Sequence, residues 1–409
     1  MSSESLRILV ISYFFPPFNR VGGRRWAKHC KYFEKENIKF NVLAGDFTGS
    51  SPWDEDIKSY RERISRIELV KPKTPYFKKK LPDNILQKII WKASLIFWQF
   101  KKKMLKGNYN DTSLGNKNSF YNQAKSIIAR ENINTVILSC GPFTYSSILP
   151  ILKSNFPHLK YVLDYRDYWE DGFIGLTNKQ ISNEIKNQLE VVNSVDLILS
   201  PNLEMQKHYA ETFDKPSYLL PHCIDQDNLK NLPKKTPTKG IQLIYGGAFY
   251  DQIGENIALI KKFIDQFNRF QKTTADFYVS VKGYEKELAH PSLNRFDFIE
   301  SSLYFEKVIQ ADYVILILPP NRVNAMSSKF FELIALRKPI LYFGKEGMVS
   351  EFIVRNKLGF HITLNNLEEQ IKEIIDNLNT ARIPDPSYDI STHTFEYHTK
   401  FLIKKLESL

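Results

Sequence analysis

The segment 324–339 brings together residue types that can bind a phosphorylated ligand. Ser327 or Ser328 would cap the start of a helix, and the N–H groups of a helix start bind anions such as a diphosphate. Lys329 adds a positive charge, and Glu332, one turn further on, can accept hydrogen bonds from the two hydroxyls of a ribose. The alternative interpretation is an ordinary capped helix with Glu332 in solvent.

A second segment, 163–172, holds four acids, one arginine and aromatic residues within ten positions. A carboxylate just after a strand can accept a proton from a sugar hydroxyl, and a tryptophan face can cover sugar C–H groups, which suggests a role for Trp169. Asp167, with Arg166 beside it, is the best candidate for chemistry. The alternative is that Asp164 and Arg166 pair only with each other and cap the next helix.

Paired glycines suggest further points where the backbone could approach a ligand. Gly22 and Gly23 precede a helix and are followed by Arg24 and Arg25, so an anion could bind at this helix start. An ordinary glycine-rich turn with two solvated arginines is the alternative.

In the second half of the chain, Gly246 and Gly247 directly follow an apolar run, and Lys282 with Gly283 follows the next one. A phosphate or a sugar could approach the backbone at these positions. Each pair taken alone is weak evidence for a phosphate or sugar site.

These segments need elements that hold them, and the sequence predicts a parallel sheet in each half of the chain. Short β-branched apolar runs alternate with helical patterns, which is typical of βαβ units. A Pro-, Lys- and Gly-containing break at 231–240 separates the halves. The predicted strands are Arg7–Ser12, Phe40–Ala44, Thr135–Ser139, Tyr161–Tyr165, Leu197–Ser200, Ile241–Tyr245, Phe277–Lys282, Tyr313–Leu318 and Pro339–Phe343.

The fold class is therefore α/β, with two Rossmann-like doubly wound domains, 1–230 and 236–390, facing an interdomain cleft. A chain of 409 residues with 43% hydrophobic content is long enough for two cores. Ligands bind beyond the carboxyl ends of the strands in such sheets, where the segments above lie. Three scattered cysteines predict free thiols in a cytoplasmic protein, and the eight histidines lack metal-ligand spacing, so no metal or other cofactor is expected.

Most of the net charge of +12 is concentrated in an insert at 71–107, which holds eleven lysines and one acid. Its apolar residues follow a helical repeat from Leu86 to Met104, and Trp91 and Trp98 lie within it. A basic amphipathic helix of this kind binds anionic membrane surfaces. Packing against the core is the alternative. Nucleic acid is not an expected partner, because no nucleic-acid-binding signature accompanies the charge.

The order of these segments, over nearly the whole chain, resembles the retaining glycosyltransferases of family 4. The matching motifs are Phe-Pro-Pro at 15–17 with Gly-Gly-Arg-Arg-Trp at 22–26, Asp-Tyr-Arg-Asp-Tyr-Trp at 164–169, and Ser-Ser-Lys-Phe-Phe-Glu at 327–332. The resemblance implies a GT-B fold, a metal-independent reaction and a C-terminal helix, 391–409, that packs back on the first domain. In the family's Glu-x7-Glu motif the second Glu corresponds to Glu332, and Asn324 replaces the first.

We therefore expect transfer of a sugar, with retention, from a UDP- or GDP-sugar to a glycan or lipid-linked saccharide. Such an enzyme would serve cell-surface polysaccharide synthesis, of capsule or lipopolysaccharide, at the inner face of the plasma membrane. Two alternatives remain open. One is a non-catalytic nucleotide-sugar-binding or scaffold protein, suggested by Asn324, and the other is a nucleotide-sugar epimerase of the same fold.

Overall fold

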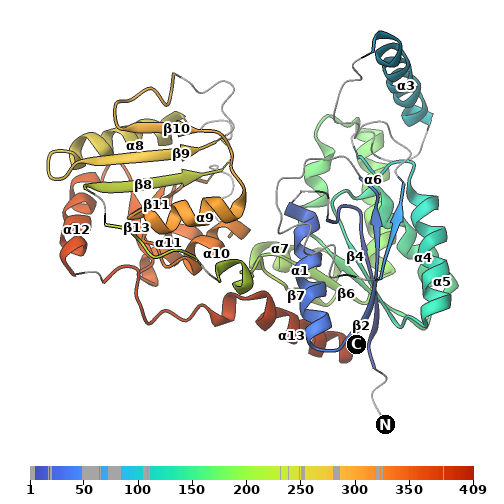
Figure 1. The fold of residues 1–409 in the computed structure, drawn as a ribbon. Helices are drawn as coiled ribbons and strands as arrows, with labels where there is room; N and C mark the ends of the chain where they lie inside the picture. Colours follow the sequence, from blue (N-terminus) through green and yellow to red (C-terminus); the bar gives the residue numbers. More distant parts are fainter. Residues whose placement is uncertain are drawn as a thin grey trace. The chain divides into compact units, whose positions relative to one another are not determined.

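The structure is a computed structural model, and the chain forms two compact units (Figure 1). The first unit spans Met1–Pro221 and Phe395–Leu409, and the second spans His222–Thr394. The residues that the structure describes are 5–16, 18, 21–47, 64, 66–71, 84–104, 108, 111–230, 232–237, 239–247, 249, 254–279, 286–318, 323, 326–380 and 382–409.

The first unit contains a parallel sheet of seven strands in the order β3-β2-β1-β4-β5-β6-β7. Neighbouring pairs run parallel throughout; for example, Val10 of β1 pairs with Val42 of β2 and Ile137 of β4. The strands are β1 (Arg7–Ser12), β2 (Lys39–Gly45), β3 (Ile67–Val70), β4 (Thr135–Ser139), β5 (Lys160–Asp164), β6 (Leu197–Ser200) and β7 (Ser217–Leu219).

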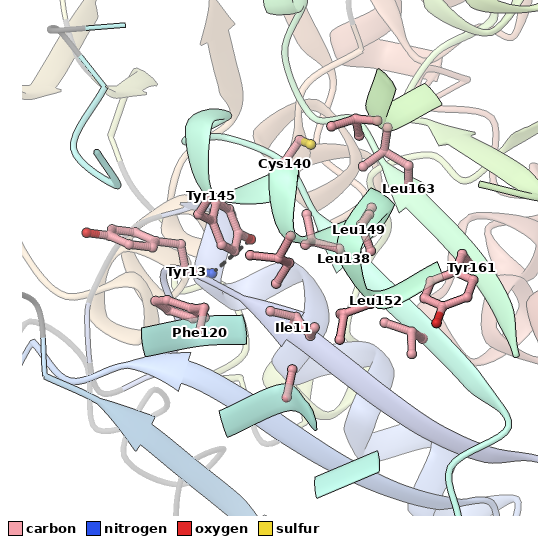
Figure 2. Close-up of a cluster of buried hydrophobic side chains, with 14 of the residues drawn as sticks. Ile11, Tyr13, Phe120, Leu138, Cys140, Tyr145, Leu149, Leu152, Tyr161 and Leu163 are labelled. Carbon is pink, nitrogen blue, oxygen red and sulfur yellow. Dashed lines mark hydrogen bonds between the residues drawn. The ribbon is translucent and has the colours of Figure 1, made fainter. Parts of the chain in front are cut away.

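Helices cover both faces of this sheet, which explains why its central strands are continuous apolar runs. Ile8 and Val10 of β1 belong to a core that includes side chains of α1 and α13, whereas Leu9 and Ile11 belong to a second core with α4 and α5. Figure 2 shows part of this second core around Ile11. The helices are α1 (Val21–Lys35), α3 (Ile85–Met104), α4 (Lys117–Glu131), α5 (Ile148–Asn155), α6 (Asn178–Asn193), α7 (Leu203–Phe213) and α13 (Phe395–Glu407), with short 3-10 helices η2 (Thr144–Ser147) and η3 (Trp169–Phe173).

The C-terminal helix α13 packs on α1 within the first unit. Nδ1 of His29 lies 2.8 Å from Oγ1 of Thr399, and Lys400 pairs with Glu36 at 3.5 Å. Leu402 of α13 is fully buried. α13 thus contributes to the same hydrophobic core as β1 and α1.

The second unit is also doubly wound, around a parallel sheet of six strands in the order β10-β9-β8-β11-β12-β13. One core includes side chains of α8 and α12, and another includes α9, α10 and α11. The strands are β8 (Ile241–Gly246), β9 (Thr273–Tyr278), β10 (Leu293–Phe296), β11 (Tyr313–Leu316), β12 (Ile340–Phe343) and β13 (Gly359–Ile362). The α-helices are α8 (Gly254–Phe267), α9 (Ser301–Gln310), α10 (Ser328–Ala335), α11 (Met348–Arg355) and α12 (Leu367–Thr380). Two short 3-10 helices are η4 (Gln226–Leu229) and η5 (Ser391–His393). Among all helices of the described ranges, none is long and apolar enough to cross a membrane.

The predicted α/β class with two doubly wound sheets is confirmed. The four strands that we did not predict, β3, β7, β10 and β13, are the outer strands of the two sheets. Each contains a polar residue or glycine (IELV, SYL, LNRF and GFHI), so they lack the continuous apolar run that marks an inner strand. The range Phe277–Lys282 was wrong, because β9 begins earlier, at Thr273, where polar residues interrupt the apolar pattern.

The division between the units falls after Pro221, earlier than the expected boundary at 230. Residues just after it belong to the second unit because Ile224 donates its N–H to the carbonyl of His393 at 2.8 Å and packs with Phe331 and Ala335. The same contact keeps 391–394 in the second unit, so only α13 joins the first.

A buried carboxylate ties the centre of the first unit together. Asp164, at the end of β5, is fully buried and accepts hydrogen bonds from Nε1 of Trp26 at 2.7 Å, Oγ of Ser139 at 3.0 Å and the guanidinium of Arg25 at 3.2 Å. Arg25 also donates to the carbonyls of Leu220 and Pro221. The alternative interpretations, in which Asp164 pairs only with Arg166 and Arg25 is solvated, are therefore wrong.

We predict that Asp164→Asn destabilises the first unit by about 3–5 kcal/mol, because it leaves the buried Arg25 guanidinium without a compensating charge. All five tryptophans precede residue 222, so a urea titration followed by tryptophan fluorescence reports on this unit alone. Glu211→Gln is the control, since the exposed Glu211–Lys207 pair at 3.8 Å contributes about 1 kcal/mol or less. An unchanged urea midpoint in Asp164→Asn would show that the carboxylate does not hold the unit together.

Candidate functional site

In the second unit, the start of α10 has the geometry of an anion-binding helix end. Ser327 is the residue that caps α10, and its hydroxyl accepts a hydrogen bond from the N–H of Phe330 at 3.3 Å. Ser328 is the first residue of the helix. The first turn of a helix leaves N–H groups available to a ligand, and the helix dipole favours negative charge there. Both serines and Lys329 therefore lie where a phosphate would be bound.

The amine of Lys329 lies against the end of β8. Its Nζ is 4.9 Å from the centre of the Tyr245 ring, and a Cβ atom placed on Gly247 would lie 2.4 Å from Nζ. A side chain at 247 would therefore displace the amine from this position. Burial lowers the pKa of Lys329 to about 8, although Glu332 opposes this shift.

A tyrosine that sequence reasoning did not find occupies the space beside Gly246. A Cβ atom at Gly246 would lie 2.3 Å from the ring of Tyr304, which projects from α9. Burial raises the pKa of the Tyr304 hydroxyl, and the charge of Glu332 contributes to the same shift. Glu332 itself is partly buried. Tyr304 carries no spacing signal in the sequence, because α9 is an ordinary amphipathic helix.

In the first unit, the guanidinium of Arg166 is held between two glycines. It donates from Nε to the carbonyl of Cys140 at 2.8 Å and also donates to the carbonyl of Gly141. A Cβ atom would lie 1.1 Å from Nη1 of Arg166 if placed on Gly22, and 2.7 Å from Nη2 if placed on Gly141. Gly141 has a φ of +92°, a conformation that favours glycine. Arg166 therefore depends on both glycines.

Asp167 follows Arg166 and is exposed. Its Oδ2 would lie 3.6 Å from a Cβ at Gly141, so the carboxylate lies beside the guanidinium of Arg166 at the carboxyl ends of β4 and β5. An exposed carboxylate next to a fixed cation can hydrogen-bond an incoming hydroxyl and accept its proton.

Gly22 and Gly23 lie in the first turn of α1 rather than in the turn before it. At Gly23 a Cβ atom would approach the backbone of Phe14 and Phe15 to 3.1 Å, so this glycine lets α1 pack closely on the loop after β1. Arg24 is partly buried in the same helical turn.

Trp169 cannot offer a face to a sugar, so this expectation was wrong. Its side chain is 1% exposed, stacks on Phe143 with ring centres 5.1 Å apart, and donates from Nε1 to Glu184 at 3.1 Å. Burial raises the pKa of Glu184. Trp169 therefore serves the core of the first unit.

The structure thus brings together predicted residues within each unit. Gly22, Arg166 and Asp167 meet in the first unit, and Gly247 and Lys329 meet in the second, with Glu332 and Gly246 joined to them through Tyr304. Gly141 was missed, although a Gly-Pro pair directly after a predicted strand could have indicated it. Lys282 and Asn324 lie outside the described residues.

Comparison with known proteins gives structural likeness without sequence likeness. No protein-family model matches the chain, and no curated protein matches it. Sucrose-phosphate synthase from Thermosynechococcus elongatus superposes with a TM-score of 0.56 at 9% identity, covering 98% of this chain and 94% of that one. An α-glucosyltransferase in complex with UDP and DNA gives 0.57 at 12% identity, covering 98% and 100%.

A Listeria monocytogenes protein whose description names it a UDP-N-acetylglucosamine 2-epimerase gives a TM-score of 0.55 at 13% identity, covering 98% of this chain and 96% of that one. At these identities the likeness concerns the fold. The chain therefore has the GT-B fold, with two Rossmann-like domains built on parallel sheets of seven and six strands.

Proposed function

We propose that the chain is a glycosyltransferase that takes a sugar from a UDP- or GDP-sugar and transfers it, with retention, to a glycan or lipid-linked saccharide. The observation that carries the proposal is the site at the start of α10, where a capped helix end, the Lys329 amine on the Gly247 backbone and Glu332 lie within one unit. Structural neighbours that bind UDP or UDP-glucose support a nucleotide-sugar donor.

For the donor, we assign the diphosphate to the start of α10 and the ribose hydroxyls to Glu332. The helix dipole and the charge of Lys329 would offset the negative charge that develops on the leaving diphosphate. A metal ion is then not required, and we propose a metal-independent reaction. Lys282 and Asn324 complete the proposed donor side, with Asn324 near the sugar.

For the acceptor, we assign the exposed Asp167 carboxylate to the attacking hydroxyl and Arg166 to its orientation. Gly22, Gly23 and Arg24, at the start of α1, remain candidate phosphate-binding residues of the first unit. The basic insert at 71–107 favours an acceptor at an anionic membrane, as in capsule or lipopolysaccharide synthesis at the inner face of the plasma membrane.

Two other functions make different use of the same site. The likeness to a protein named as an epimerase favours interconversion of nucleotide sugars, and Asn324 in place of a carboxylate favours binding without catalysis. A panel of UDP- and GDP-sugars, offered with and without lipid-linked acceptors, separates the three. Acceptor-dependent release of nucleotide supports transfer, interconversion without acceptor supports the epimerase, and binding alone supports the scaffold.

We predict that Glu332→Ala weakens nucleotide binding by roughly 1.5–3 kcal/mol through loss of charge-assisted hydrogen bonds to the ribose. Isothermal titration calorimetry with UDP and GDP measures the change. Glu351→Ala is the matched control, because Glu351 lies in the first turn of α11 in the same unit and is exposed. Unchanged affinity in Glu332→Ala would remove Glu332 from the donor site.

Lys329 predicts a pH dependence of donor binding. Its pKa of about 8 means that the amine is charged below this pH and neutral above it, so affinity for the diphosphate should fall as the pH rises through about 8. Lys329→Met should bind roughly 10-fold or more weakly at neutral pH and lose this dependence, since a charged partner is absent at every pH. Lys345→Met, at an exposed position after β12, should behave as the wild type. A wild-type affinity that stays constant from pH 7 to 9 would contradict the assignment.

Asp167→Asn should lower turnover by about 100-fold or more and leave nucleotide binding nearly intact, because the amide cannot accept the proton of the acceptor hydroxyl. Steady-state rates are compared with UDP and GDP affinity in the same variant. Asp171→Asn, a second exposed acid of the same loop, is the control. If nucleotide affinity fell as much as turnover, Asp167 would belong to the donor side.

A further inference from the structure

Helix α3 presents large apolar side chains to solvent. Figure 1 draws it apart from the sheet of the first unit. Its exposed apolar residues are Ile85 (75%), Leu86 (64%), Ile89 (58%), Ile90 (61%), Ile96 (68%), Phe97 (65%) and Phe100 (65%). A helix that packs on a core buries such residues, so core packing does not explain this stripe.

The exposed apolar residues lie on one side of α3. At 100° per residue the exposed stripe covers one arc of the helix. Trp91, Ser94 and Leu95 lie outside this arc and are partly buried, and Nε1 of Trp91 is shielded from solvent. The exposed apolar side chains of α3 therefore form one stripe along the helix.

Positive charge accompanies the exposed stripe. Lys88 and Lys92 are exposed on α3, next to the apolar arc on the helical repeat. The sequence adds lysines at 78–80 before the helix and at 101–103 at its end, and α3 contains no acid. An apolar stripe bordered by lysines matches an anionic lipid surface. The apolar side chains can insert among the acyl chains, and the lysines can pair with the anionic headgroups.

We infer that α3 is a membrane-binding helix that lies in the plane of an anionic bilayer, with Phe97 and Phe100 inserted. A second copy of the chain is a poorer occupant, because joining two such stripes would bring two rows of lysines together without acids to compensate them. A nucleic acid would use the lysines and leave the apolar stripe unexplained.

The membrane-binding helix is connected to the loop that carries Asp167. Asn108, four residues beyond the end of α3, donates from Nδ2 to the carbonyl of Gly172 at 2.8 Å. The neighbouring Ile174 is 82% exposed. α3 would therefore hold the proposed acceptor loop near the lipid surface, where a lipid-linked acceptor lies. This connection rests on the proposed function, whereas membrane binding itself does not.

The test is co-sedimentation of the full chain with vesicles of phosphatidylglycerol and phosphatidylcholine in equal parts, compared with phosphatidylcholine alone. Binding to the anionic vesicles should be at least about tenfold tighter, and should weaken between about 0.1 M and about 1 M salt as the Debye length shortens. Failure of the wild type to bind anionic vesicles at low salt would overturn the proposal.

Matched variants separate the apolar stripe from the lysines. The double variant Phe97→Ser, Phe100→Ser should bind at least about tenfold more weakly. Phe270→Ser in the second unit should bind normally, although Phe270 is also 65% exposed. Lys88→Gln with Lys92→Gln should weaken binding roughly 10- to 30-fold, whereas Lys262→Gln with Lys372→Gln should not. Undiminished binding of the Phe97, Phe100 variant would overturn the proposal.

Two further measurements distinguish membrane binding from dimerisation and from the proposed transfer activity. Sedimentation equilibrium of the wild type and the double phenylalanine variant tests the competing occupant, and a dimer that only the wild type forms would overturn the membrane assignment. Transfer to a soluble acceptor analogue should persist in the double phenylalanine variant. Vesicle binding without any transfer activity would contradict the proposed function alone and leave the membrane assignment intact.

Discussion

The buried ion pair between Arg25 and Asp164 is the interaction on which the first unit depends. It fixes the start of α1 against the carboxyl end of β5, and Trp26 and Ser139 supply the remaining bonds to the carboxylate. Because the helix is fixed there, Gly22 lies against the guanidinium of Arg166. Removing one partner of this buried ion pair would leave the other charge uncompensated, so the pair supports the geometry around Asp167. The acid that holds the fold and the acid proposed for chemistry are thus three residues apart.

In the second unit, Gly246 and Gly247, at the end of β8, leave space for side chains of the protein itself. Gly246 leaves space for the ring of Tyr304, and Gly247 leaves space for the amine of Lys329. The amine consequently loses hydration, which lowers its pKa to about 8. A lysine in this state gains much from an anionic ligand, because a phosphate restores the partner that water no longer provides. Binding of the proposed anionic ligand would therefore offset the cost of burying the charge.

The first unit also shows two opposite uses of aromatic and apolar residues. Trp169, which stands in a segment rich in acids, is buried in the core, whereas Phe97 and Phe100 of α3 are exposed. Polar neighbours in sequence do not predict exposure, since a side chain's surroundings come from elements distant in the chain. Hydrophobic character in turn does not guarantee burial, as the exposed Phe97 and Phe100 show.

The sequence by itself determined the inner strands of both sheets apart from the bounds of β9, the capped start of α10 and the amphipathic character of α3. These features are local: strands buried on both faces are continuous apolar runs, and a helix cap is a matter of a few adjacent residues. The outer strands β3, β7, β10 and β13 escaped prediction because they are short or partly exposed and gain stability mainly from one neighbour. Only the tertiary structure decided that Asp164 pairs with Arg25 rather than Arg166, that Gly22 makes room for a guanidinium and that Tyr304 lies on Gly246. Each of these contacts joins residues far apart in the chain, and their meeting depends on packing that no local pattern encodes.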